Sequence, residues 1–131
     1  MAEPVLNYDE VSDTLSVAFE PGEKATGIEL NDHILMRINR RERKAIGLTF
    51  INYSVLAQRT ALGRRSFPLT GLAELSPELR EVVLDILQKP PVTEFLAVSA
   101  YTPAYFIEPI PITALQSLPA ITQEAKHVHH R

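Results

Sequence analysis

The stretch from residue 14 to residue 51 decides the fold, and it reads TLSVAFEPGEKATGIELNDHILMRINRRERKAIGLTFI. Apolar side chains at positions 15, 17 and 19 alternate with small or polar ones, the period of two that a half-buried strand shows. The same alternation returns at positions 46, 48 and 50. Pro21-Gly22 and Asn31-Asp32 are turn signals between the runs. The pattern predicts an antiparallel β-meander, in which sequential strands are neighbours, with strands at 14–19, 27–30, 33–39 and 45–51.

The flanks of this stretch are less regular. Residues 5–8 form a short extended entry, and residues 9–13 are typical of a turn, because Asp and Ser side chains bond nearby backbone groups. The apolar trio Ile34, Leu35 and Met36 places apolar side chains on both faces of its strand, which favours a central position or a face covered by a partner. Residues 52–56 either extend the last strand or begin a short helix, and residues 63–71 resemble a loop.

One helix is predicted near residues 77–88. Ser76 is a favourable N-cap, and Pro77 suits the first helical position. Apolar side chains recur at the spacing of one helical face, and Pro90-Pro91 ends the helix. The apolar positions are Leu79, Val82, Val83, Ile86 and Leu87.

Further extended segments follow at 94–101 and 105–112. Pro109 and Pro111 lack N–H donors, so the second segment is expected at a sheet edge or outside the sheet. The fold class is therefore α+β: an antiparallel β-meander sheet of about five to seven strands, with one principal helix packed on one face. We expect one domain over 1–118, divided into a meander at 4–56 and a helix-strand extension at 57–118, and a poorly ordered tail at 119–131.

Composition agrees with a single globular domain. The chain has 131 residues, of which 45% are hydrophobic and 22% charged, close to globular averages. It contains no cysteine, which excludes disulfides and thiolate metal sites and fits a reducing compartment. The N-terminus lacks the basic and apolar segments of a signal peptide, and no apolar run is long enough to cross a bilayer. A cytoplasmic location is expected.

Charge is segregated along the chain. The net charge is −7 over residues 1–32, +7 over residues 33–66 and −3 over residues 67–131. Such blocks describe surfaces and partners rather than the fold.

The quoted motifs resemble those of a small bacterial β-meander family, the domain of unknown function 2283. The resemblance spans roughly residues 4–56 and is carried by Tyr8-Asp9, Asp13 and the runs 15–19 (LSVAF), 27–30 (GIEL) and 45–48 (AIGL). It implies a cytoplasmic bacterial protein with an unsettled role. Since some members of that family lie beside toxin-like partners, it also implies an antitoxin-like binding role. The fold carries over better than the function.

Catalytic and metal sites are weakly indicated. Asp9, Glu10 and Asp13 lack the glycine and terminal glutamate of a calcium loop, so we interpret them as turn residues. A Ser/His/Asp set from Ser54 or Ser66, His33 and Asp32 lacks any spacing that would define a triad. The tail histidines lack a closed tetrahedral ligand set; they are His127, His129 and His130. No cofactor, metal or catalytic residue is therefore predicted, and an enzyme is disfavoured.

The basic block is the candidate partner surface. Its members surround one predicted hairpin and the following loop: Arg37, Arg40, Arg41, Arg43, Lys44, Arg59, Arg64 and Arg65. Three interpretations stay open: a solvated hairpin tip, a protein-binding surface that meets the acidic block within or between subunits, and a nucleic-acid contact.

These observations predict a non-catalytic protein-interaction or regulatory module. Apolar faces exceed what one sheet and one helix need, so a homodimer is expected. The alternatives are a nucleic-acid-associated protein that uses the arginine-rich hairpin and, third, a small hydrolase or metal-dependent enzyme. No membrane association is expected.

Overall fold

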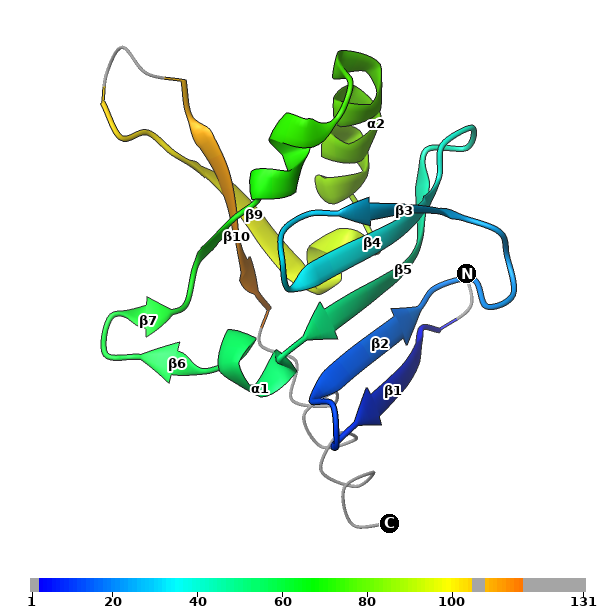
Figure 1. Ribbon diagram of the computed structural model, residues 1–131, viewed down its shortest axis with the longest axis horizontal. Helices are drawn as coiled ribbons and strands as arrows, with labels where there is room; N and C mark the ends of the chain where they lie inside the picture. Colours follow the sequence, from blue (N-terminus) through cyan, green and yellow to red (C-terminus); the bar gives the residue numbers. More distant parts are fainter. Residues whose placement is uncertain (1–2, 105–107, 117–131) are drawn as a thin grey trace.

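The computed structural model describes residues 3–104 and 108–116, and its largest element is an antiparallel five-stranded sheet. The sheet order is β1-β2-β5-β4-β3, and Figure 1 shows it beside a smaller sheet and below the main helix. The predicted α+β class is confirmed. The five strands are β1 Val5–Asp9, β2 Thr14–Ala18, β3 Thr26–Glu29, β4 Ile34–Asn39 and β5 Lys44–Ile51.

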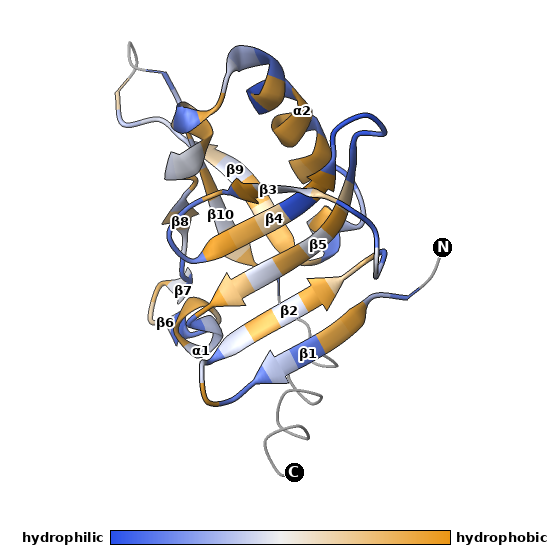
Figure 2. Cartoon of the chain, turned by 45° about the vertical axis from the view of Figure 1, so that its right-hand side comes forward, coloured by the Kyte–Doolittle hydropathy of each residue, from blue (hydrophilic) through white to orange (hydrophobic). Residues whose placement is uncertain are grey.

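Alternation decides which face of the sheet is buried. Leu15 of β2, Phe50 of β5 and Ile34 of β4 lie directly opposite one another in register and are all buried. The next pair along the strands, Ser16 and Thr49, points to the other face and is partly exposed. The alternation of apolar and polar residues along β2 is visible in Figure 2. The sequence prediction of a half-buried sheet is confirmed.

One connection departs from a simple meander. β3, β4 and β5 are sequential neighbours, but β2 pairs with β5 instead of β3. The chain after β2 stays on the β5 side, where the N–H groups of Phe19 and Glu20 donate to Ile46 O at 2.8 and 3.3 Å. Residues 20–25 then lead to the far edge of the sheet, where β3 begins. The expectation that every sequential pair of strands is adjacent is corrected at this point.

Two turns between neighbouring strands of the large sheet place a non-glycine residue in the left-handed backbone region. Asp13, at the end of the β1–β2 turn, has φ 53°, and Arg43, in the β4–β5 hairpin, has φ 51°. Asp9 stabilises the first turn, because its carboxylate accepts from Val11 N and from Ser12 Oγ. The turn predicted for residues 9–13 is confirmed.

Residues 52–75, which had no clear pattern, contain short elements. After Asn52 come α1 Tyr53–Leu56, the hairpin of β6 Arg59–Thr60 and β7 Gly63–Arg64, the strand β8 Phe67–Pro68 and the 3-10 turn η1 Thr70–Glu74. Gly71 holds η1 against the large sheet, since its N–H donates to Leu30 O at 2.8 Å.

The principal helix, α2, spans Pro77–Leu87, as predicted. Ser76 is its N-cap, and its side chain accepts from Leu79 N. Val83, Ile86 and Leu87 are buried in the same apolar cluster as the core face of the large sheet. A 3-10 turn, η2 Val92–Glu94, follows, so the predicted strand at 94–101 begins later, as β9 Leu96–Tyr101.

A second antiparallel sheet has the order β8-β10-β9, with β10 at Ile110–Leu115. The prediction that Pro111 forces this segment to an edge is wrong, because β10 is the central strand. Pro111 O accepts from Leu69 N, so the backbone of Pro111 faces β8. β8 has only two residues, and the missing N–H of Pro111 therefore interrupts little of the ladder.

One core joins the two sheets. Leu96 of β9 and Leu115 of β10 belong to the same buried cluster as Val17, Met36 and Leu48 of the large sheet. The meander and the extension therefore fold around shared apolar contacts. The tail predicted at 119–131 lies outside the described residues.

Candidate interaction surface

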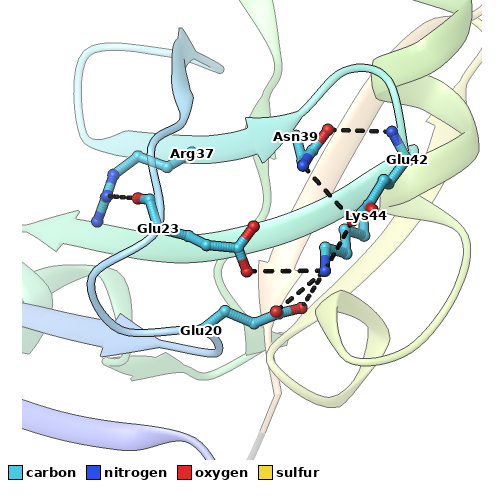
Figure 3. Close-up of polar contacts among 6 residues, drawn as sticks. All are labelled: Glu20, Glu23, Arg37, Asn39, Glu42 and Lys44. Carbon is cyan, nitrogen blue, oxygen red and sulfur yellow. Dashed lines mark hydrogen bonds and ion pairs between the residues drawn. The ribbon is translucent and has the colours of Figure 1, made fainter.

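Lys44, at the start of β5, stands among three carboxylates. Its Nζ lies 2.9 Å from Glu20 Oε2, 3.7 Å from Glu23 Oε2 and 2.9 Å from Glu42 Oε1. Figure 3 shows the ammonium between side chains from the β2–β3 connection and the β4–β5 hairpin. The cluster ties the crossing segment to the neighbouring hairpin, and it brings together the acidic and basic blocks of the sequence within one chain.

The charged side chains of this cluster shift one another's pKa values. Hydrogen bonds to Glu20 and then Glu42 raise the pKa of Lys44. The hydrogen bond from Lys44 lowers the pKa of Glu20, whereas the hydrogen bond between Glu23 and Glu20 raises the pKa of Glu23. Near neutral pH, Lys44 therefore remains a cation and Glu20 a carboxylate.

Lys44→Gln is expected to lower the thermal midpoint at pH 7, because the carboxylates then face one another without a cation. A lowered carboxyl pKa contributes stability above its unfolded value, and that contribution is lost as the pH falls through the folded value. The deficit of Lys44→Gln should therefore shrink on acidification. Thermal unfolding followed by circular dichroism at pH 7 and pH 3.5 measures it. The control is Lys24→Gln, at an exposed cation; an equal loss in both variants would contradict the pairing.

Arg37 and Arg43 also have partners within the chain. Arg37 Nη2 donates to Glu23 O at 3.3 Å, as Figure 3 shows. Arg43 lies 3.7 Å from Glu81 and 3.6 Å from Asp85, both on α2. These two residues of the predicted surface bind the chain itself.

The remaining predicted residues divide into two groups. Arg64 donates to Leu115 O and Gln116 Oε1, and Arg65 donates to Gln58 Oε1, on and beside the β6–β7 hairpin. Arg59 lies on the same hairpin. Arg40 and Arg41 lie at the tip of the β4–β5 hairpin, on the opposite side of the molecule (Figure 1). The eight predicted residues therefore do not form one surface.

The tip of the β4–β5 hairpin keeps its positive charge. Lys24, Arg40 and Arg41 line an open hollow of about 440 Å³, and no ion pair joins them to residues in the described part of the chain. Glu42 also lines the hollow, but its carboxylate is bound by Lys44. We call Lys24, Arg40 and Arg41 the cationic tip. Sequence reasoning missed Lys24, the one base within residues 1–32.

The acidic turn residues have structural partners. Asp13 accepts from Ser54 N at 3.1 Å and from Ser54 Oγ at 2.6 Å, so it caps the first turn of α1. It also accepts from the Tyr8 hydroxyl at 2.5 Å. Burial and this bond raise the pKa of Tyr8 to about 12. These contacts support the interpretation of the acidic residues as turn residues.

The structure does not support the Ser/His/Asp set considered in the sequence. Ser54 bonds Asp13 rather than Asp32, and His33 Nδ1 lies 3.4 Å from Asn52 Nδ2. Within residues 3–104 and 108–116, no group of three or more His, Cys, Asp or Glu side chains is placed to hold a metal ion. His127, His129 and His130 lie outside the described residues. No helix in the described part of the chain has the length and apolarity needed to cross a membrane.

Comparisons with protein-family models, with curated proteins and with solved structures return no match. The resemblance to the domain of unknown function 2283 family stays a prediction.

Proposed function

We propose that this chain is a non-catalytic protein-interaction module that forms a homodimer and binds an acidic surface of a second protein through the cationic tip. The observation that carries the proposal is the arrangement of charges at the β4–β5 hairpin. Lys44 and Arg43 form ion pairs with the nearby carboxylates. Lys24, Arg40 and Arg41 form none with the described residues and remain exposed around one hollow.

The kind of partner follows from the size of the tip. Three cations around one hollow suit a local cluster of carboxylates, and such complementarity steers association and selects a partner. The described residues that line the hollow include no aromatic ring on which a nucleobase could stack. The antitoxin-like role implied by the family resemblance is one form of this proposal, in which the second protein is a toxin.

Charge reversal tests the partner surface. We expect Arg40→Glu/Arg41→Glu to reduce retention of the bound protein about tenfold at low salt, because two attractive charges become repulsive. The wild-type chain and the variant are immobilised and exposed to nuclease-treated lysate, and retained proteins are quantified. Arg59→Glu/Arg65→Glu on the β6–β7 hairpin is the matched control. Recovery of only the chain itself, or an equal loss of retained protein in the two variants, would contradict the proposed partner surface.

Nucleic-acid binding is the second candidate, since the same three cations could contact phosphates. An electrophoretic mobility assay with duplex DNA and with single-stranded RNA at low salt separates the two candidates. A shift that Arg40→Glu/Arg41→Glu abolishes would replace the protein partner by a nucleic acid. Absence of a mobility shift would exclude nucleic-acid binding, the second candidate.

A further inference from the structure

The two main sheets end in four edge strands, and three of them have features that discourage pairing with another chain. β1 has acidic residues at both ends, Glu3 on one side and Asp9 and Glu10 on the other. β3 is short and is followed directly by the contact of Gly71 with Leu30 O. β8 has two residues, one of them Pro68. Charges, proline and shortness are the usual means by which natural edges avoid unwanted strands.

The fourth edge, β9, has none of these features. Its sequence is LAVSAY, six residues without a charge, a proline or a glycine. Its pairing with β10 is regular along its whole length, without a register shift. Such a segment favours strand pairing, and a free edge of this kind is rare in a protein that stays monomeric.

The backbone of β9 has hydrogen-bonding groups that β10 does not use. Phe95 O accepts from Gln116 N, which fixes the side that faces β10. Because successive residues of a strand turn their N–H and C=O groups to opposite sides, Ala97 and Ser99 also face β10. Leu96, Val98 and Ala100 face away from it. Leu96 is fully buried, whereas Val98 is partly buried and Ala100 exposed, so the accessible part of the edge is its C-terminal half. No hydrogen bond from these outward groups to the described residues is seen.

The side chains around this edge are apolar and unusually exposed. Tyr101 is 56% exposed and Ile110 is 40% exposed, and the two lie opposite each other in register. Ile112 continues the same face and is only partly buried. This face does not belong to the buried core, to which Leu96 and Leu115 contribute from the opposite face.

We propose that β9 pairs antiparallel with β9 of a second copy of this chain, so that the two three-stranded sheets become one continuous sheet. A two-fold axis at Ala100 places Ala100 opposite its own copy and Val98 opposite Thr102 of the second copy, within the accessible half of the edge. The outward groups of Val98 and Ala100 are then satisfied, and Ser99 meets Tyr101 of the second copy. The ladder brings no two charges together, whereas the same pairing at β1 would bring acidic residues close to one another.

This inference deepens the homodimer of the proposed function, on which it rests, by placing its interface. It leaves the cationic tip available, because Lys24, Arg40 and Arg41 lie on the β2–β3 connection and the β4–β5 hairpin and not on the small sheet.

Ala100→Pro is the sharpest test, because Ala100 is exposed and its N–H faces away from β10. Proline there removes a donor that only the second copy would use, and it is tolerated at such an edge position. Ser99→Lys adds a charge to the exposed face without altering any backbone donor. Asn7→Lys adds the same charge to the exposed face of β1 and is the matched control.

Size-exclusion chromatography with light scattering, at concentrations from about 1 to 100 µM, gives the mass of each protein. Wild type and Asn7→Lys should have the dimer mass, while Ala100→Pro and Ser99→Lys should dissociate with at least about tenfold weaker Kd. Far-UV circular dichroism establishes folding, and if Ala100→Pro does not fold, Ser99→Lys decides. A dimer that persists in the folded variants would overturn the β9 interface but retain the homodimer. A monomeric wild type would remove the homodimer itself.

Discussion

Gly71→Ala is expected to destabilise the protein by about 3 kcal/mol, which corresponds to a fall in thermal midpoint of roughly 10 °C. A Cβ on Gly71 would lie 1.7 Å from Glu29 O, 2.9 Å from Glu29 C and 3.1 Å from Leu30 C. These atoms belong to the backbone at the end of β3, so no side-chain rotation can relieve the overlap. The Gly71 N–H bond to Leu30 O at 2.8 Å would be lost as η1 moves away.

Gly27→Ala on β3 is the control for this prediction. A Cβ there meets only Leu35 Cδ1 at 3.9 Å, an ordinary contact. The variant should be neutral or slightly more stable, because alanine restricts the unfolded chain more than glycine does. Urea unfolding of both variants measures the difference. Equal stabilities would mean that η1 does not approach β3 as closely as the structure indicates.

Phe50→Ala is expected to cost about 3–5 kcal/mol. Phe50 is 1% exposed, lies between Leu15 and Ile34 in the register of the large sheet, and packs edge-on against Tyr53 with ring centroids 6.2 Å apart. Removal of its ring would leave a cavity at the middle of the core face, which the neighbouring strands cannot close without disturbing their pairing.

The next residue in the strand supplies the comparison. Ile51 is 42% exposed and points to the opposite face, so Ile51→Ala should cost less than about 1 kcal/mol. Chemical denaturation of the two variants gives both free energies of unfolding. Similar losses at positions 50 and 51 would show that the two faces of β5 are not distinguished by burial, contrary to the alternation on which the fold prediction depends.

Local pattern was sufficient to predict the individual elements. The alternation at 14–19 and 45–51 located β2 and β5, and the spacing near residues 77–88, with Ser76 and Pro77 at its start, located α2. These elements are specified by which side chains share a face, and that information lies within a few residues.

The strand order and residues 52–75 depend on contacts between distant segments. Alternation in β2 does not indicate whether β3 or β5 will lie beside it. In the structure, the N–H groups of Phe19 and Glu20 donate to Ile46 O and so continue the contact between β2 and β5. The first turn of α1 is capped by Asp13, 41 residues before Ser54. The position of Pro111 in a central strand was missed for the same reason, since the brevity of β8 makes it tolerable.

The candidate surface was predicted as a set of charges but not as a geometry. The sequence shows a basic block, whereas the structure assigns Lys44 to a carboxylate cluster, Arg43 to α2, and Arg40 and Arg41 to the cationic tip with Lys24. The position of β9 as an edge strand without charge, proline or glycine could not be recognised from the sequence alone. An uncharged strand is equally typical of a buried central strand, and only the arrangement of its neighbours distinguishes the two.

Residue-resolved amide hydrogen exchange, measured by NMR at high and low protein concentration, tests the central claim of a homodimer that pairs through β9. The Ser99 amide, which faces β10, should be protected at both concentrations. The Val98 and Ala100 amides should be protected only where the dimer is populated, and they should lose protection on dilution. Fast exchange of Val98 and Ala100 at every concentration, beside a protected Ser99, would contradict the pairing.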